Sequence, residues 1–342
     1  MPLISVTMPA YNTRESYLRA AIESILRQSF TDYEFIIVND SPENPSVRAV
    51  VDSYRDVRIK YVENPTTLGV AQSYNHLLEL AAGKYIAMMN HDDIALPERL
   101  AKQYAYLESC PEVGLVGTGY KKFGEINRFK TVRNPVNDAE IRASLLFKSP
   151  IHHPTIMFRR SLIEQHHIRY NENFISLNDR QFYYDIGQEA KLANLPEILY
   201  RYRFHKDMVS KRNKPAIFRE QCAFHEFWLN AAGMELSPKE KEILDNYVSQ
   251  GRCHIKDRAT LAQVGTVLDK LAAENRARGF VPAAEFEAIC ARYLVKRCLN
   301  AAVYGGINSA AVLKKSRLPV QDGLLLKICN LVLHWRGAEQ AC

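Results

Sequence analysis

The chain has 342 residues, of which 47% are hydrophobic and 24% are charged, as in an ordinary globular protein. Its formal net charge of +7 is compatible with anionic substrates, membrane surfaces or nucleic acid and selects none of them. The seven cysteines show no C-x-x-C spacing, which argues against a disulfide or zinc framework and favours free thiols in a reducing compartment. With no visible signal peptide and no apolar run long enough to span a bilayer, we expect a cytoplasmic protein.

The first part of the chain alternates short apolar runs with helical patterns. Strands are predicted at 4–8, 35–38, 59–62, 85–89 and 113–116. Helices are predicted at 45–54, 69–82 and 96–110, and another follows Asn12, which with Glu15 resembles a capping box. This alternation is typical of a wound, mostly parallel sheet with flanking helices.

Carboxylates follow two of these strands. Asp40 follows the second strand, and Asn90-His91-Asp92-Asp93 follows the fourth. With right-handed crossovers both groups lie at the carboxyl edge of the sheet, where open α/β sheets bind ligands. Two adjacent acids favour a hard divalent cation that also bridges phosphates, although a solvated helix-capping turn is the alternative. No G-x-G-x-x-G or G-x-x-x-x-G-K-[ST] loop is present, which excludes the phosphate cradles of Rossmann dehydrogenases and P-loop enzymes.

The middle of the chain is less regular. Strands are predicted at 130–133, 155–158, 192–195 and 199–204, and a helix capped by Asp138 at 138–147. His152 and His153 point to opposite sides of an extended chain, so we do not expect them to ligate one metal; each either packs or faces the substrate. Asp179 lies in the first turn of a helix, as a functional carboxylate or only as a cap.

The later residues supply basic and helical segments. The stretch 201–214 has six Lys or Arg against one acid, and it is either a solvated loop or a cover for a bound pyrophosphate. Beyond 215 the pattern is helical, with a capping box at Ser237-Pro238-Lys239-Glu240. The apolar helix expected at 324–335 is too short to span a membrane and either lies in an anionic membrane interface or packs on the protein. We divide the chain into an α/β domain, 1–214, and a helical region, 215–342.

Ordered motifs over residues 3 to about 210 resemble the family 2 glycosyltransferases of GT-A fold. The motifs are Ser5-Val6-Thr7-Met8-Pro9-Ala10-Tyr11-Asn12, Ile36-Ile37-Val38-Asn39-Asp40-Ser41, Leu68-Gly69-Val70-Ala71, Asn90-His91-Asp92-Asp93, His153-Pro154-Thr155, Asn178-Asp179 and Tyr202-Arg203-Phe204-His205. The pattern is closest to non-processive bacterial transferases that extend lipooligosaccharide, O-antigen or capsule chains. Residues 215–342 resemble nothing that we recognise.

The resemblance implies roles for individual residues. Pro9 and Tyr11 would line the uridine pocket, and Asp40 would hydrogen-bond uracil. Asp92 would contact the ribose or the metal, and Asp93 would ligate a divalent ion, Mn²⁺ or Mg²⁺. Asp179 would be the general base, and His205 would lie near the diphosphate or the metal.

The sequence departs from the family pattern at a few of these positions. Asn39 and Asn90 replace the first Asp of their motifs, Ser41-Pro42 replaces Gly-Ser, and Arg180 follows Asp179 where an aromatic residue or an acid is common. The change at Asn90 removes one negative charge from the edge of the expected metal site.

The implied reaction is an inverting, metal-dependent transfer of one sugar from a UDP-sugar to a hydroxyl of a surface glycan or glycolipid, giving a β-linkage. UDP-N-acetylglucosamine is favoured as donor, then UDP-galactose. We expect peripheral contact with the cytoplasmic face of the inner membrane and no nucleic-acid partner. One alternative is a non-catalytic glycan- or membrane-binding protein that retains the GT-A fold. Another, a sugar-nucleotide nucleotidyltransferase, would require a glycine-rich loop where Pro9-Ala10-Tyr11-Asn12 stand.

Overall fold

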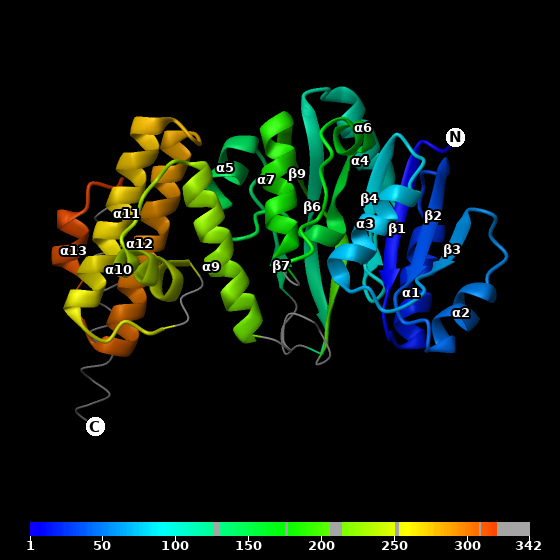
Figure 1. Ribbon diagram of the computed structural model, residues 1–342, viewed down its shortest axis with the longest axis horizontal. Coiled ribbons are helices and arrows are strands. Elements are labelled where there is room, and N and C mark those ends of the chain that lie inside the picture. The colour runs from blue at the N-terminus through cyan, green and yellow to red at the C-terminus, as the bar shows by residue number, and fades with distance from the viewer. Residues whose placement is uncertain (126–129, 175–176, 206–213, 250–252, 308, 320–342) are drawn as a thin grey trace. The chain divides into compact units, whose positions relative to one another are not determined.

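The structure is a computed structural model that describes residues 1–125, 130–174, 177–205, 214–249, 253–307 and 309–319 (Figure 1). The chain forms two compact units. The sheet unit comprises residues 1–141 and 149–220, and the helical unit comprises residues 142–148 and those from 221 onward. The segment 142–148 thus belongs to the helical unit, although it precedes the predicted boundary at 214/215 in the sequence.

The sheet unit is built on one mixed sheet. Its described strands are β1 (Ile4–Ala10), β2 (Tyr33–Asn39), β3 (Ile59–Glu63), β4 (Tyr85–Met88), β5 (Ile94–Ala95), β6 (Val113–Gly124), β7 (Thr131–Val132), β8 (Met157–Arg159) and β9 (Lys191–Phe204). The strand order is β3-β2-β1-β4-β8-β6-β9-β5, and β7 pairs with β6. Strands β1 to β4 are parallel, as predicted, whereas β8 runs antiparallel to both β4 and β6. The α/β fold with flanking helices is confirmed, with antiparallel strands inserted into the parallel sheet.

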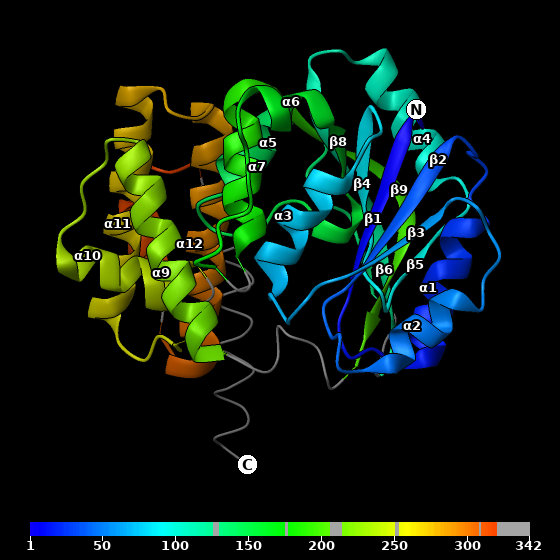
Figure 2. The same ribbon diagram turned by 45° about the vertical axis from the view of Figure 1, so that its right-hand side comes forward.

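The winding of the sheet reverses between β1 and β4. Helices α1 (Glu15–Leu26) and α2 (Pro45–Asp52) connect strands that step outward from β1, whereas α3 (Val70–Leu80) returns the chain to β4 on the other side of β1. Because such crossovers are right-handed, α3 lies on the face opposite α1 and α2 (Figure 2). The carboxyl ends of β1 and β4 therefore flank a topological switch point, where sheets of this class bind ligands.

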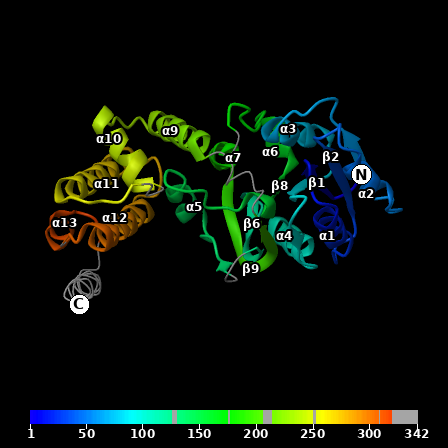
Figure 3. The ribbon, with the colours of Figure 1, turned by 90° about the horizontal axis from the view of Figure 1, so that it is seen from below.

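Helices cover both faces of the sheet. Figure 3 shows α3, α6 (Arg160–Gln165) and α7 (Asn178–Glu189) on one face, with α1 and α4 (Arg99–Ser109) on the other. This double cover explains why β1, β2 and β4 read as nearly continuous apolar runs: all their residues except Pro9 are buried.

A buried arginine connects the strands behind the carboxyl edge. The Arg99 guanidinium donates hydrogen bonds to the carbonyl oxygens of Met88 (2.7 Å) and Ile156 (3.2 Å) and to Oε1 of Gln103 (3.0 Å). Burial lowers the pKa of Arg99 to about 10, so the side chain remains cationic at neutral pH. Met88 ends β4, so Arg99 fixes the strand end from which Asn90, Asp92 and Asp93 follow.

Several local predictions need correction. Asn12 does not cap α1: the helix begins at Glu15, and Asn12 has a left-handed φ of 41° with its Oδ1 accepting from Asn44 (3.0 Å). Asp138 is the first residue of α5 (Asp138–Ser144) and not its cap: Oδ1 of Asn137 accepts from the amide of Glu140 (2.9 Å), whereas Oδ1 of Asp138 accepts from the amide of Leu192 (2.9 Å).

Two strand predictions were also incomplete. The predicted strands at 192–195 and 199–204 are one strand, β9, with irregular pairing near Gly119 of β6. The segment His153–Thr155 is a 3₁₀ turn, and the strand that follows it is Met157–Arg159.

The helical unit contains most of the C-terminal residues. Its described helices are α10 (Pro238–Ile243), a π-helix (Leu244–Ser249), α11 (Arg258–Arg278), α12 (Ala283–Gly305) and α13 (Ala310–Lys315), and α9 (Lys214–Ala231) enters it from the sheet unit. The capping box at Ser237 and Glu240 is confirmed by reciprocal bonds of 2.7 and 3.3 Å. Across the described ranges no helix is both long and apolar enough to cross a membrane. The helix expected at 324–335 lies outside those ranges.

Candidate active site

The carboxyl edge of β1, β2 and β4 brings the first motifs together. Ala10 pairs with Asn39 across β1 and β2, and Thr7 pairs with Met88 across β1 and β4. Tyr11, Asp40 and the Asn90–Asp93 segment therefore follow neighbouring strand ends, as the sequence predicted for the two acidic groups. Tyr11 is 44% exposed at this edge, so its ring is accessible to a ligand.

Asp40 is bound by the loop before α3. Its Oδ1 accepts hydrogen bonds from the amide of Leu68 (2.8 Å) and from Nδ2 of Asn64 (2.7 Å), and its Oδ2 accepts from the amide of Gly69 (2.9 Å). The side chain is only 4% exposed. Gly69 has a φ of 90°, a conformation that favours glycine. Asp40 therefore shapes this loop, and its contact with uracil stays a prediction that would require it to share or release one of these donors.

Asp93 is fully buried and surrounded by donors. Its Oδ1 accepts from the amide of Arg203 (2.6 Å), and its Oδ2 accepts from the hydroxyl of Tyr200 (3.0 Å) and from Nδ2 of Asn90 (3.1 Å). Burial, with the charge of Asp92, raises its pKa well above the usual range. The side-chain amide of Asn90 thus donates to the buried Asp93 carboxyl, whereas an Asp at position 90 would repel it. Metal ligation by Asp93 stays a prediction and would require it to lose these bonds.

Asp92 and His205 form a pair at the same edge. Nε2 of His205 lies 2.9 Å from Oδ2 of Asp92, and the Asp92 carbonyl oxygen accepts from Nε of Arg203 (2.6 Å). The Tyr17 ring packs against both His205 (ring centroids 5.6 Å apart) and the Arg203 guanidinium (4.1 Å). A carboxylate oxygen and an imidazole nitrogen so placed fit a divalent ion. Over the described ranges no group of three His, Cys, Asp or Glu is arranged to hold a metal, so the ion would complete its shell with phosphate oxygens and water.

Asp179 lies in the first turn of α7, as predicted. Its Oδ2 accepts a hydrogen bond from the hydroxyl of Ser149 (3.0 Å), whereas its buried Oδ1 has no hydrogen-bond partner among the described residues. Burial raises the pKa of Asp179 to about 6, although the Ser149 bond and the charge of Arg180 oppose this. A carboxylate with a pKa near the working pH suits a general base.

The charges of both carboxylate groups act on Tyr74 of α3. Its buried hydroxyl has a pKa raised by burial and further by the charges of Asp179, Asp92 and Asp93. All three carboxylates therefore lie within electrostatic range of one side chain on α3.

His152 and His153 enter different clusters, as their adjacency predicted. Nε2 of His153 lies 2.9 Å from the hydroxyl oxygen of Tyr170. The His152 ring instead stacks on the Tyr120 ring, with the two ring centroids 4.0 Å apart. Burial lowers the pKa of both histidines to about 3, so both are neutral at physiological pH. Neither histidine contacts the Asp92–His205 pair in any described interaction.

Comparisons with known proteins give the family. Residues 5–167 match the family described as Glycosyl transferase family 2. An uncharacterised glycosyltransferase of Methanocaldococcus jannaschii is 32% identical over 237 residues, which cover 67% of this chain and 80% of that protein. The chain belongs to the family 2 glycosyltransferases. The O-antigen biosynthesis glycosyltransferase WbnJ of Escherichia coli is 31% identical over 65% of this chain and 87% of that protein.

The fold of this glycosyltransferase is shared with a solved structure. TarS of Staphylococcus aureus (residues 1–349), crystallised with UDP-GlcNAc, superposes with a TM-score of 0.58. The match covers 87% of this chain and 86% of that one at 16% sequence identity. At this identity the likeness establishes the fold alone.

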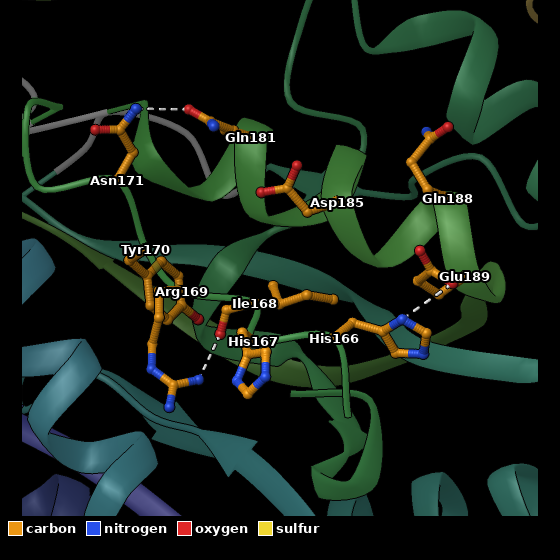
Figure 4. A pocket seen from close by; sticks show the side chains of 10 residues that line it. All are labelled: His166, His167, Ile168, Arg169, Tyr170, Asn171, Gln181, Asp185, Gln188 and Glu189. Carbon is orange, nitrogen blue, oxygen red and sulfur yellow. Dashed lines mark hydrogen bonds and ion pairs between the residues drawn. The ribbon is translucent and has the colours of Figure 1, made fainter. Parts of the chain in front are cut away.

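A separate cavity lies beside the face of α7 that is opposite Asp179 (Figure 4). It encloses about 450 Å³ between the 166–171 loop and residues Gln181, Asp185, Gln188 and Glu189 of α7. Gln181, Asp185 and Gln188 follow helical spacing, about 200° around the axis from Asp179. Burial raises the pKa of Asp185 to about 6. None of the predicted site residues lines this cavity.

Several side chains at the candidate site were not singled out from the sequence, among them Ser149, Tyr74 and Tyr200. Tyr200 stands in an apolar strand and Tyr74 in an apolar helix stripe, where aromatic residues ordinarily pack in the core. Ser149 stands in an unpatterned segment. No local signal distinguishes them, because their roles depend on partners that are distant in the sequence.

Proposed function

We propose that this glycosyltransferase transfers one sugar from a UDP-sugar, UDP-N-acetylglucosamine ahead of UDP-galactose, to a hydroxyl of a bacterial surface glycan or glycolipid, with inversion to a β-linkage. The observation that carries this proposal is the Asp92–His205 pair, in which a carboxylate oxygen and an imidazole nitrogen lie 2.9 Å apart after the carboxyl end of β4. This pair would form the edge of a metal site, and Asp179 would be a separate carboxylate base. The O-antigen role in the name of the E. coli relative and the UDP-GlcNAc bound to TarS support the acceptor and donor classes.

Asp92 and His205 would hold the divalent ion, Mn²⁺ or Mg²⁺. When bound, such an ion neutralises the negative charge that develops on the leaving diphosphate. The chain's own part is to orient its ligands: Arg203 donates to the Asp92 carbonyl, and Tyr17 packs against the His205 ring. Asp93 anchors the edge from behind through Tyr200 and the backbone of β9, which holds Asp92 toward His205.

Asp179 would accept the proton of the acceptor hydroxyl. An alcohol is a poor nucleophile until a base takes its proton, and Oδ1 of Asp179, which has no hydrogen-bond partner among the described residues, would be the acceptor. With Asp179 as the one base assigned among the described residues, a single displacement is proposed, which would invert the anomeric centre.

The nucleoside would lie at the ends of β1 and β2. Pro9 and Tyr11 would line its pocket, and Asp40 would act there through the Leu68–Gly69 loop whose amides it binds. We place the reaction at the cytoplasmic face of the inner membrane, with peripheral contact through the helical region.

The experiment is UDP release from a panel of UDP-sugars, with Mn²⁺ and with chelator. Metal-dependent release from UDP-N-acetylglucosamine, with transfer to a glycan acceptor, is the expected result. The Asp179→Asn variant should lose transfer and still bind UDP. Absence of release from every UDP-sugar, while UDP binds, would refute the donor class.

A further inference from the structure

Ser149 lies beside the proposed base and has two acceptors for one proton. Its Oγ is 3.0 Å from Oδ2 of Asp179 and 3.0 Å from the carbonyl oxygen of Ile151. A hydroxyl carries one proton and donates to one acceptor at a time. Hydrogen bonds to an ionised group are roughly twice as strong as those between neutral groups. While Asp179 is ionised, the Ser149 proton therefore points to Oδ2 and not to the carbonyl of Ile151.

This bond makes the two oxygens of Asp179 different. Oδ2 is held by Ser149, whereas Oδ1 is buried and has no hydrogen-bond partner in the described ranges. A buried acceptor without a donor is unfavourable, so a hydrogen bond to Oδ1 from a hydroxyl of the substrate would stabilise the complex. The geometry also fixes the carboxylate plane, since rotation of the side chain would break the Ser149 bond.

We propose that Ser149 is a positioning residue for sugar transfer: it holds Oδ2 of Asp179 so that Oδ1 faces the acceptor hydroxyl. This inference rests on the proposed function, in which Asp179 is the base. The acceptor hydroxyl transfers its proton to Oδ1 while its oxygen bonds to the anomeric carbon. The bond from that carbon to the diphosphate oxygen breaks, and its electron pair leaves with the nucleoside diphosphate. Ser149 keeps its own proton throughout.

Ser149 also biases the protonation of Asp179. When Oδ2 takes up a proton from water, the carboxyl group can donate to Ser149 Oγ, and Ser149 can turn its proton to the carbonyl of Ile151. Both states are hydrogen-bonded, but only the ionised state has a charge-assisted bond. Loss of the hydroxyl therefore favours the protonated carboxyl, which cannot act as a base.

The other groups that face Asp179 come from several elements. Arg180 on α7 is cationic and favours the ionised carboxyl. Tyr74 on α3, Tyr170 in the loop before α7 and Tyr183 on α7 interact with its charge. Their pKa values are raised chiefly by burial, so these hydroxyls stay neutral across the working pH range. Asp179 is thus the group here that titrates near pH 6.

The first test measures Asp179 directly by ¹³C NMR of the whole protein labelled at the aspartate carboxyl carbons. The Asp179→Asn variant identifies the signal. In Ser149→Ala we expect the pKa of Asp179 to rise by about one unit, because the ionised carboxylate loses part of the free energy of one charge-assisted hydrogen bond. Ser149→Thr keeps the hydroxyl and should restore the wild-type value. Ser109→Ala is the matched control, because the Ser109 hydroxyl is exposed and donates to the carbonyl of Tyr106. An unchanged pKa in Ser149→Ala would overturn the inference.

The second test follows hydrolysis of UDP-N-acetylglucosamine with Mn²⁺ across pH. In Ser149→Ala the acidic limb of kcat should move up by about one unit, so the rate falls about fivefold at pH 6 and recovers toward pH 8. A merely structural role would lower the rate by one factor at every pH and leave the NMR titration unchanged, which would overturn the inference.

Asp179→Asn separates the two proposals. If this variant is inactive and Ser149→Ala keeps the wild-type titration, the positioning role fails and the base assignment stands. If Asp179→Asn keeps full turnover, the base assignment fails first, and the role of Ser149 in transfer fails with it.

Discussion

Replacing Asp179 by Asn should abolish sugar transfer and change how the stability of the fold depends on pH. Burial raises the pKa of Asp179 from 3.8 to about 6, so the ionised carboxylate is less favourable in the folded protein than in the unfolded chain. Above pH 6 the carboxyl is ionised in both states and this destabilises the fold by about 3 kcal/mol. At pH 5 it is largely protonated only in the folded protein, and the penalty is roughly half as large. Below the unfolded pKa the penalty disappears.

The Asn variant removes this pH-dependent penalty. The Asn side-chain amide also has N–H groups, and at the position of Oδ1 they find no hydrogen-bond partner among the described residues. A buried donor without an acceptor destabilises the fold by about 1–3 kcal/mol, independently of pH. The difference in unfolding free energy between variant and wild type should therefore be more favourable to the variant at pH 8 than at pH 5, by about 1.5 kcal/mol. The assay is urea unfolding followed by circular dichroism at both pH values, with the transitions of the two units fitted separately.

Asp185→Asn is the matched control. Asp185 lies on the same helix, beside the cavity, and burial also raises its pKa to about 6. It should show a similar pH-dependent stability change and keep transferase activity, whereas Asp179→Asn loses activity. Equal stability differences at pH 5 and pH 8 for Asp179→Asn would refute the buried-carboxylate reasoning. Retained transfer would refute its role as base.

Three further predictions test the carboxyl edge. Asp92→Asn should weaken Mn²⁺-dependent UDP binding by about 10- to 100-fold by calorimetry without unfolding the protein, and unchanged affinity would remove Asp92 from the metal site. Asp40→Ala should lower the unfolding free energy by about 2–4 kcal/mol and weaken UDP binding, because the amides of Leu68 and Gly69 lose their acceptor; wild-type stability would contradict that anchoring role. Gly69→Ala should lower the unfolding free energy by about 1–2 kcal/mol through backbone strain alone, since the φ of Gly69 is 90° and an added Cβ meets no atom within 4 Å. An unchanged melting curve would count against that backbone conformation.

Local patterns in the sequence were sufficient for much of the fold. The apolar runs and helical stripes predicted β1 to β4 with α1 to α4, because β1, β2 and β4 are buried on both faces and each helix has one buried stripe. The position of Asp179 in the first turn of α7 was also correct. The two predicted helix caps at Asn12 and Asp138 failed because each side chain hydrogen-bonds a partner that is distant in the sequence. Oδ1 of Asn12 accepts from Asn44, and Oδ1 of Asp138 accepts from the amide of Leu192.

The sequence by itself determined the family motifs, the alternating fold and the carboxylates at the strand ends, because these depend on residue type and short-range periodicity. The tertiary structure decided what each carboxylate does. Asp92 and His205 are 113 positions apart and meet at 2.9 Å. Asp93, its neighbour, is instead enclosed by Tyr200 and the backbone of β9. Hydrogen bonds between distant segments set the direction and the pKa of each group, and no local pattern contains that information.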